Sequence, residues 1–399
     1  MRNIKDIVST SPFSEKLRFG NYVKNTNQAI DECLKNKNGV YKVALVTTEN
    51  DYLFVGKKLK DELTKAGRQV TVFVFERFLS EACVDFCDVV VTLGDTGYTG
   101  CVATVLGDKK PLICISTSLA FADAFAFLYA DSALKTRPYD FSAYVIDTDL
   151  YRGMKRKDFA DGYAFSAALC LCKAECVAIK AFGGSVPDEV FSLLDYAYRV
   201  LTYINKENVV GVITVSQIYL MKAIYSYPHI SEAGIIFAGK ILSAISKDSV
   251  YECLFSCAGA TIKTVEAYIS YLGGKEAVSI PSVNDDVGKL AEILHVEPIA
   301  IYENLAFLSN ERLDVLKEKL CLASVKDALF EANNRFGVLK AKYETVYNAR
   351  HKRNEDNPER TADAVKLAGL VSEGVLSVAY YDGFTPMIAE IVKNRNNSK

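Results

Sequence analysis

The chain has 399 residues, half of them apolar and a quarter charged, with a formal net charge of -2. This length allows two domains, and the balanced charge argues against a nucleic acid or an anionic membrane as a partner. The most apolar windows, such as residues 165–182, are interrupted by charged side chains, so we expect no segment that spans a membrane.

Strand and helix patterns alternate over the first 150 residues. Residues 1–38 are mixed polar and helical in pattern, helical spacing continues at 51–66 as far as Gly67, and a helix of small residues is predicted at about 98–106. Short β-branched runs predict strands at residues 41–47, 69–75, 89–93, 113–115 and 143–146. Such alternation is typical of βαβ units with a parallel sheet.

The pattern becomes helical after about residue 151. Helices are predicted at residues 158–182, 186–204, 208–225, 231–245, 248–271, 284–295, 297–307, 311–348 and 358–393. We therefore predict an α/β, Rossmann-like parallel-sheet domain over residues 1–151 and an all-α domain over residues 152–399, with a cleft between them. The eleven cysteines show no disulfide spacing and the first residues show no apolar leader, so we expect a reducing, cytoplasmic location.

Two predicted strands end abruptly in small residues. The first runs into the glycine turn, Gly94-Asp95-Thr96-Gly97, and the second into the serine loop, residues 116–123, which opens Ser116-Thr117-Ser118. In α/β proteins, ligands that carry phosphate bind at the carboxyl ends of strands. The glycine spacing fits either a pyrophosphate turn or an ordinary strand–helix turn, and the carboxylate of Asp95 would repel phosphate unless it points away.

These segments, in this order and spacing, resemble the dehydroquinate synthase-like superfamily, which includes glycerol dehydrogenases and iron-containing alcohol dehydrogenases. Residues 110–123 (KPLICISTSLAFAD) are similar to the family's strand and Pro-Thr-Ser-Ala-Ser-x-Asp loop, and residues 143–150 (AYVIDTDL) to its Val-Asp-Thr-Asp strand. The resemblance covers about residues 40–320. It is closest to sn-glycerol-1-phosphate dehydrogenase and glycerol dehydrogenase, which implies the same two-domain dehydroquinate synthase-like fold.

The resemblance implies NAD or NADP as the cofactor, a small molecule as the ligand, and a set of site residues. Asp123 and Lys135 become the candidate catalytic residues near the substrate. The candidate cofactor-binding residues are Gly94, Asp95, Thr96, Gly97, Thr117 and Ser118. Formation of a homo-oligomer stays open.

The resemblance also implies a zinc or iron ion held by one carboxylate and two histidines, which polarises the substrate oxygen during hydride transfer. The position of the carboxylate is occupied by Ala164, and the position of the first histidine by Ala233. The position four residues after Ala233 is Phe237, and the second histidine is missing near Glu252. We therefore expect no catalytic metal.

Two other metal sites stay open as alternatives. The chain holds only three histidines, of which His229 together with Asp161 could form a displaced site. Cys172 and Cys176 share a helix face, as do residues 253 and 257, so four thiolates could bind zinc. Their apolar neighbours favour packing of these cysteines in a helical core.

Three functions are compatible with these observations. The first is a divergent relative of glycerol-1-phosphate and glycerol dehydrogenases that has lost its metal, is non-catalytic or altered, and still holds NAD(P) or a phosphorylated small molecule in the cleft. The second is an active NAD(P)-dependent oxidoreductase of a polyol or polyol phosphate, with Asp123, Lys135 or Tyr163 as acid or base. The third is a carbocycle-forming synthase of the dehydroquinate type, which also needs the metal.

Overall fold

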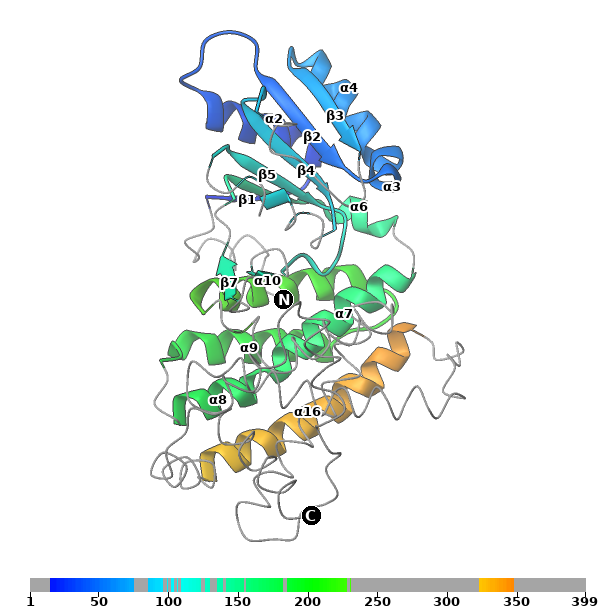
Figure 1. The fold of residues 1–399 in the computed structure, drawn as a ribbon. Coiled ribbons are helices and arrows are strands. Elements are labelled where there is room, and N and C mark those ends of the chain that lie inside the picture. Colours follow the sequence, from blue (N-terminus) through cyan, green and yellow to red (C-terminus); the bar gives the residue numbers. More distant parts are fainter. Residues whose placement is uncertain are drawn as a thin grey trace, which may run out of the picture.

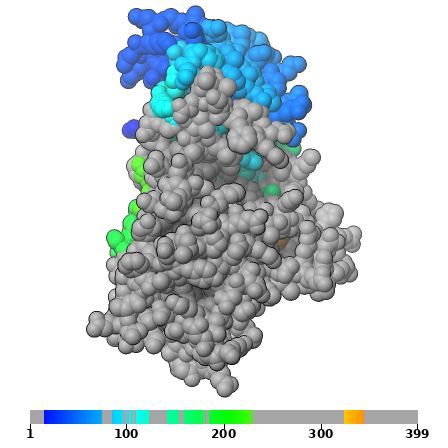
Figure 2. Space-filling view, viewed as in Figure 1, coloured from blue at the N-terminus to red at the C-terminus, as the bar shows by residue number. Residues whose placement is uncertain are grey.

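A computed structural model gives the fold as a sheet half followed by a helical half (Figure 1). The described residues are 15–74, 85–95, 99, 102–103, 106, 109–122, 126–129, 135–138, 141–153, 156–181, 185–227, 230 and 323–347. In the space-filling view, residues of the sheet half form one end of the molecule and residues of the helical half lie along its flank (Figure 2).

The sheet half is built on six strands that all run parallel, in the order β1-β8-β5-β4-β2-β3. Their bounds are β1 Leu17–Phe19, β2 Lys42–Thr47, β3 Gln69–Val74, β4 Val89–Gly94, β5 Leu112–Ser116 and β8 Ala143–Ile146. The central strands β4 and β5 are buried along their whole length, which explains their continuous β-branched composition. The predicted parallel sheet is therefore confirmed.

Three strands were missing from the prediction. β1 lies in the stretch expected to be mixed polar and helical, and it pairs with β8. The strands β6 (Ala126–Tyr129) and β7 (Lys135–Pro138) pair with each other in a separate antiparallel sheet. None of these strands contains a β-branched run like those of β5 and β8, because their sequences are Leu-Arg-Phe, Ala-Phe-Leu-Tyr and Lys-Thr-Arg-Pro.

Helices pack beside the sheet as the alternation predicts. Helix α2 (Tyr22–Leu34) begins at Asn21, whose side chain accepts a hydrogen bond from the backbone of Lys24. The next helical segment starts two residues earlier than expected, as α3 (Glu49–Asp51), continues through the π-helix η1 (Tyr52–Gly56) and ends as α4 (Lys57–Lys65). Gly67 follows it with a φ of 81°, which confirms its predicted role as the C-terminal cap.

Six helices follow β8 in the described part of the chain. They are α6 (Thr148–Arg152), α7 (Arg156–Leu171), α8 (Lys173–Ala181), α9 (Asp188–Thr202), α10 (Val209–Ser226) and α16 (Ala323–Tyr347). The single helix predicted at 158–182 is wrong, because the chain turns at Cys172 and separates α7 from α8. The helices predicted between residues 231 and 307 and at 358–393 lie outside the described residues.

Helix α10 differs from the expectation that no segment is long and apolar enough to span a membrane. Its 18 residues meet that criterion by length and composition alone. The helix packs against α9 and α7, and 67% of it is buried inside the molecule. We assign it as the central core helix of the helical half, a type of helix that passes the same test.

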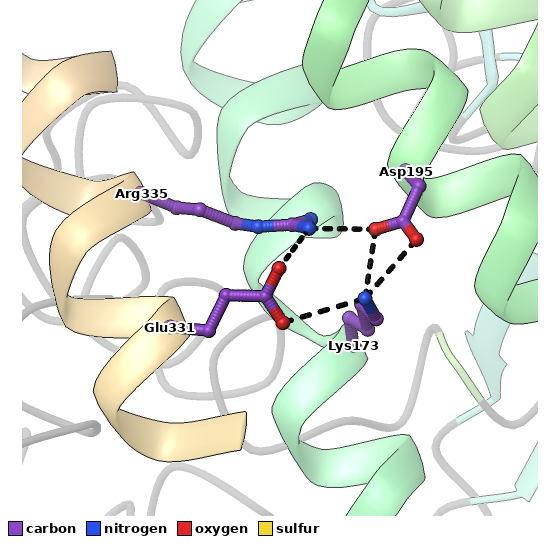
Figure 3. A network of polar contacts seen from close by, with 4 residues as sticks. All are labelled: Lys173, Asp195, Glu331 and Arg335. Atoms are coloured by element: carbon purple, nitrogen blue, oxygen red, sulfur yellow. Dashed lines mark hydrogen bonds and ion pairs between the residues drawn. The ribbon is translucent and has the colours of Figure 1, made fainter. Parts of the chain in front are cut away.

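A charged network joins three helices of this half (Figure 3). Lys173 of α8 lies 2.9 Å from the carboxylate of Asp195 on α9 and 3.4 Å from that of Glu331 on α16. Arg335 of α16 lies 2.7 Å from Asp195, also pairs with Glu331, and stacks over the ring of Tyr198 at 4.4 Å. The network ties α16 to helices that precede it in sequence by more than a hundred residues.

Candidate functional site

The sheet order places a topological switch point between β2 and β4. From β2 the chain first adds β3 on one side, and then adds β4, β5 and β8 on the other side. In open parallel sheets, ligands bind in the crevice outside the carboxyl ends of the strands at such a point. The glycine turn follows β4 directly, so it lies at this position.

The glycine turn and the serine loop lie side by side. Gly94 and Ser116 are register partners at the carboxyl ends of β4 and β5. The backbone N–H of Thr117 donates to the carbonyl oxygen of Gly94 over 3.0 Å. Two segments 22 residues apart in sequence therefore form one continuous edge, as the two strand endings predicted.

Within the glycine turn, the backbone of Asp95 accepts a helical hydrogen bond. The N–H of Thr99 donates to the carbonyl oxygen of Asp95 over 3.1 Å, with the i to i+4 spacing of an α-helix. Gly94 is buried and Asp95 is exposed. A carboxylate at a helix start is favoured by the helix dipole, and it competes there with a ligand's phosphate. Thr96 and Gly97 lie outside the described residues.

The serine loop is shaped by its own hydroxyls. The Ser116 hydroxyl donates to the carbonyl oxygen of Ser118 over 2.9 Å and accepts from its N–H over 3.1 Å. The Ser118 hydroxyl in turn accepts from the N–H of Ala120 over 3.1 Å. Thr117 lies between them, half-buried. Its hydroxyl makes no hydrogen bond within the described structure, so of the loop's hydroxyls it is the one best able to reach a ligand.

Buried aromatic side chains pack against the serine loop from the side of β8. The Phe121 ring stacks on Tyr151 at 6.2 Å, and the hydroxyl of Tyr144 on β8 donates to the Phe121 carbonyl oxygen over 3.1 Å. Cys114, beside them on β5, is fully buried, and this burial raises the pKa of its thiol to about 11. A thiol with this pKa stays protonated near neutral pH, so Cys114 belongs to the support and not to the chemistry.

The two candidate catalytic residues are not brought together by the described structure. Asp123 lies outside the described residues. Lys135 is the first residue of β7, opposite Tyr129 of β6, and its side chain is also outside the described part. Both remain predictions.

Sequence reasoning missed a third segment at the switch point, directly after β2. The hydroxyl of Thr48 accepts from the N–H of Asp51 over 3.2 Å and donates to its carboxylate over 2.7 Å. Together with the exposed Glu49, this capped turn adds two carboxylates to the edge where the glycine turn lies. A threonine followed three residues later by an acidic residue after a buried strand is the signal that could have revealed it.

Helix α7 carries the segment that resembles a metal-binding motif. Ala164, at the position of the carboxylate ligand, is fully buried, and Asp161 is half-buried. The hydroxyl of Tyr163 donates to the carbonyl oxygen of Leu339 over 3.0 Å, so it holds α16 against α7. His229 lies outside the described residues. Within the described ranges, no group of three or more His, Cys, Asp or Glu side chains is arranged to hold a metal ion.

The cysteines of α7 and α8 are core residues. Cys170, Cys172 and Cys176 are free and have at most 1% of their surface exposed. Burial raises the pKa of all three thiols. This agrees with the packing alternative for the described cysteines, whereas residues 253 and 257 lie outside the described part.

Comparison of the whole fold with solved structures finds dehydrogenases. By sequence, no family model and no curated protein matches the chain. An archaeal halo-thermophilic alcohol dehydrogenase from a Red Sea brine pool, bound to NZQ, is 14% identical, with a TM-score of 0.51 over 95% of this chain and 96% of that one. The iron-containing alcohol dehydrogenase of Thermococcus thioreducens is 13% identical, with a TM-score of 0.50 over 96% of this chain and 98% of that one.

Glycerol dehydrogenase from Schizosaccharomyces pombe is also similar, at 14% identity and a TM-score of 0.48, over 88% of this chain and 95% of that one. The two structures with TM-scores of 0.51 and 0.50 establish the fold, and at these identities the activity stays open. The chain has the dehydroquinate synthase-like fold of the iron-containing alcohol dehydrogenases.

Proposed function

We propose that this chain is a divergent relative of glycerol and glycerol-1-phosphate dehydrogenases that binds a nicotinamide dinucleotide and does not carry out metal-dependent hydride transfer. The observation that carries the proposal is the pairing of Gly94 with Ser116 at the switch point, in a chain whose α7 has Ala164 at the carboxylate position. The strand ends at which a nucleotide could bind are present, whereas the side chains that coordinate the metal in the family are replaced.

The polar groups along this edge suit the ribose hydroxyls of a dinucleotide. Thr117 offers a hydroxyl without a partner in the described structure, and the carboxylates of Glu49, Asp51 and Asp95 follow the adjacent strands. Carboxylates accept hydrogen bonds from ribose hydroxyls, whereas they repel phosphate. We therefore infer that NAD is preferred over NADP, because these carboxylates repel the additional phosphate of NADP.

The loss of metal chemistry rests on the residue types at the family's ligand positions. The side chains of Ala164, Ala233 and Phe237 have no atom that can coordinate a metal ion, and the chain holds only three histidines. An active polyol dehydrogenase would need another acid or base. Tyr163 is a poor candidate, because burial raises the pKa of its hydroxyl and that hydroxyl already donates to Leu339.

A thermal-shift and calorimetric screen of NAD, NADP and sugar phosphates tests the proposal. A nucleotide at one hundred times its Kd stabilises the protein by about 2.7 kcal/mol, which a melting curve detects. We expect NAD to raise the Tm and bind more tightly than NADP. The variant Thr117→Val, which keeps the shape and removes the hydroxyl, is expected to weaken NAD binding by about fivefold to tenfold.

Thr71→Val is the matched control. Thr71 is a half-buried strand threonine on β3, away from the carboxyl ends of β4 and β5, so this change leaves the NAD affinity unaltered. Equal effects of the two variants, or no shift with any nucleotide, would contradict the proposed site.

A further inference from the structure

We propose that Gln217 is a positioning residue that locks the serine loop to the helical half, so that the ligand edge keeps its shape only while the two halves are docked. Gln217 comes from the core helix α10, and its side chain is fully buried. The effect of this lock on ligand affinity rests on the proposed function, whereas its effect on the loop itself does not.

The amide of Gln217 makes hydrogen bonds in two directions. Its Oε1 accepts from the backbone N–H of Ala122, in the serine loop, over 2.8 Å. Its Nε2 donates to the Ser166 hydroxyl on α7 over 2.7 Å and lies 3.4 Å from the carbonyl oxygen of Gly162. The Gln217 side chain therefore reaches from α10 to bond both α7 and a loop of the sheet half.

The same loop is held at two further points. A Cβ atom on Gly162 would lie 2.6 Å from the Cβ of Leu119, so the loop packs directly on the backbone of α7. From the sheet side, the Tyr144 hydroxyl donates to the carbonyl oxygen of Phe121. The Ser116–Ala122 segment is thus held from both halves, and Gln217 supplies the polar contact from the helical side.

Because the Ala122 N–H is buried, its hydrogen bond to Gln217 affects the stability of the loop. A buried backbone N–H without an acceptor is costly, so removing the Gln217 oxygen favours opening of the loop at Ala122. Thr117 and Ser118 lie in the same short loop, and Thr117 is hydrogen-bonded to Gly94 through its backbone. A shift that starts at Ala122 therefore moves the residues that we expect to contact the nucleotide.

Gln217 differs in this respect from its neighbour Ser216. The hydroxyl of Ser216 is also fully buried, but it donates to the carbonyl oxygen of Ala197 on α9 over 3.3 Å. The hydroxyl of Ser216 thus bonds within the helical half. It provides a matched control on the same helix, at the same depth.

The experiment compares Gln217→Met, Gln217→Glu and Ser216→Ala in the full chain, by hydrogen exchange and NAD titration. Methionine keeps the length and apolar stem of the side chain but removes the acceptor, so we expect about tenfold faster exchange of the 116–122 peptide. Glutamate keeps an acceptor for the Ala122 N–H, but it places a carboxylate oxygen where Nε2 faces the Gly162 carbonyl oxygen. We therefore expect the Tm to fall while the loop stays protected from exchange.

If Gln217 only stabilises the fold, exchange of the 116–122 peptide should become faster in proportion to the loss of Tm in every variant. The lock predicts slow loop exchange and tight NAD binding in variants whose residue 217 accepts a hydrogen bond from the Ala122 N–H. It predicts fast exchange and weaker binding in variants that lack this acceptor, whatever their Tm. Ser216→Ala is expected to change exchange in α9 and α10 and to leave the 116–122 peptide unaltered.

If Gln217→Met does not fold, Ser166→Ala removes only the partner of Nε2 and is expected to give a smaller increase in loop exchange. Equal loop exchange in the wild type and in folded Gln217→Met, or in Ser166→Ala if Gln217→Met does not fold, would overturn the lock. A wild type that binds no NAD would defeat only the proposed function, because the exchange comparison decides the lock independently.

Discussion

At the scale of single residues, the contact between the two halves depends on one glycine. Gly162 is buried in α7, where a side chain would collide with Leu119. Gly162→Ala is therefore expected to destabilise the protein by about 1–3 kcal/mol, measured by chemical unfolding.

Gly337→Ala is the control for this change. Gly337 is an exposed glycine within α16, and nothing lies within 4 Å of an added Cβ there. Alanine at that position is expected to stabilise the protein by about 0.5–1 kcal/mol through helix propensity. The same sign for both variants would rule out close packing as the role of Gly162.

The described cysteines lead to a second prediction at this scale. Cys114, Cys170, Cys172 and Cys176 are fully buried, whereas Cys33 is half-buried. Burial raises the pKa of all five thiols, so accessibility to the reagent is what separates Cys33 from the other four. Alkylation of the native protein at mildly alkaline pH, mapped by mass spectrometry, is expected to modify Cys33 long before these four. Early modification of Cys170 or Cys172 would contradict their assignment as core residues.

At the scale of elements, we expect the network of Figure 3 to make the attachment of α16 dependent on pH. Burial raises the pKa of Asp195, but hydrogen bonds from Lys173 and Arg335 outweigh it and leave the pKa below its ordinary value of 3.8. The folded state thus favours the ionised carboxylate. Its stabilising contribution is present above that ordinary value and is lost as the pH falls through the lowered one.

Asp195→Asn tests this dependence. We expect it to reduce the free energy of unfolding at neutral pH by about 1–3 kcal/mol. The difference from the wild type should shrink as the pH falls below the ordinary carboxyl pKa of 3.8, in denaturant titrations followed by circular dichroism. Glu62→Gln, in an exposed pair with Lys65 on α4, is expected to change stability little at either pH. A constant difference across the pH range would contradict the role of Asp195.

Elements also show how far sequence reasoning reaches. The central strands were predicted because burial on both faces selects long β-branched runs such as Val89–Gly94. β1 was missed because its sequence, Leu-Arg-Phe, has no β-branched residue, and it pairs with β8, which is more than 120 residues away. The break at Cys172 was missed because apolar residues continue through it.

The candidate site was predictable only in part. Its two strand endings were visible as small residues after buried runs, and their adjacency followed from the parallel sheet. The contact between Ala122 and Gln217 joins residues 95 apart in sequence. No local pattern marks such a pair, since a glutamine in an apolar helix is equally compatible with many partners.

At the scale of the whole molecule, the fold packs the serine loop, at the sheet edge where we propose that a dinucleotide binds, against α7, which carries Ala164 at the position of the family's carboxylate ligand. The division at residues 151 and 152 stays a prediction. The locked serine loop further suggests that both halves take part in shaping the ligand edge, so the sheet half alone should bind nucleotide less well than the full chain.

The central claim is that nucleotide binding persists without metal-dependent turnover. The most direct measurement titrates NAD into chelator-treated protein by calorimetry, repeats the titration after loading with Zn²⁺ or Fe²⁺, and follows NADH formation with glycerol and glycerol phosphate as substrates. We predict the same NAD affinity in all preparations and no NADH. Metal-dependent NADH formation that a chelator abolishes would contradict the account.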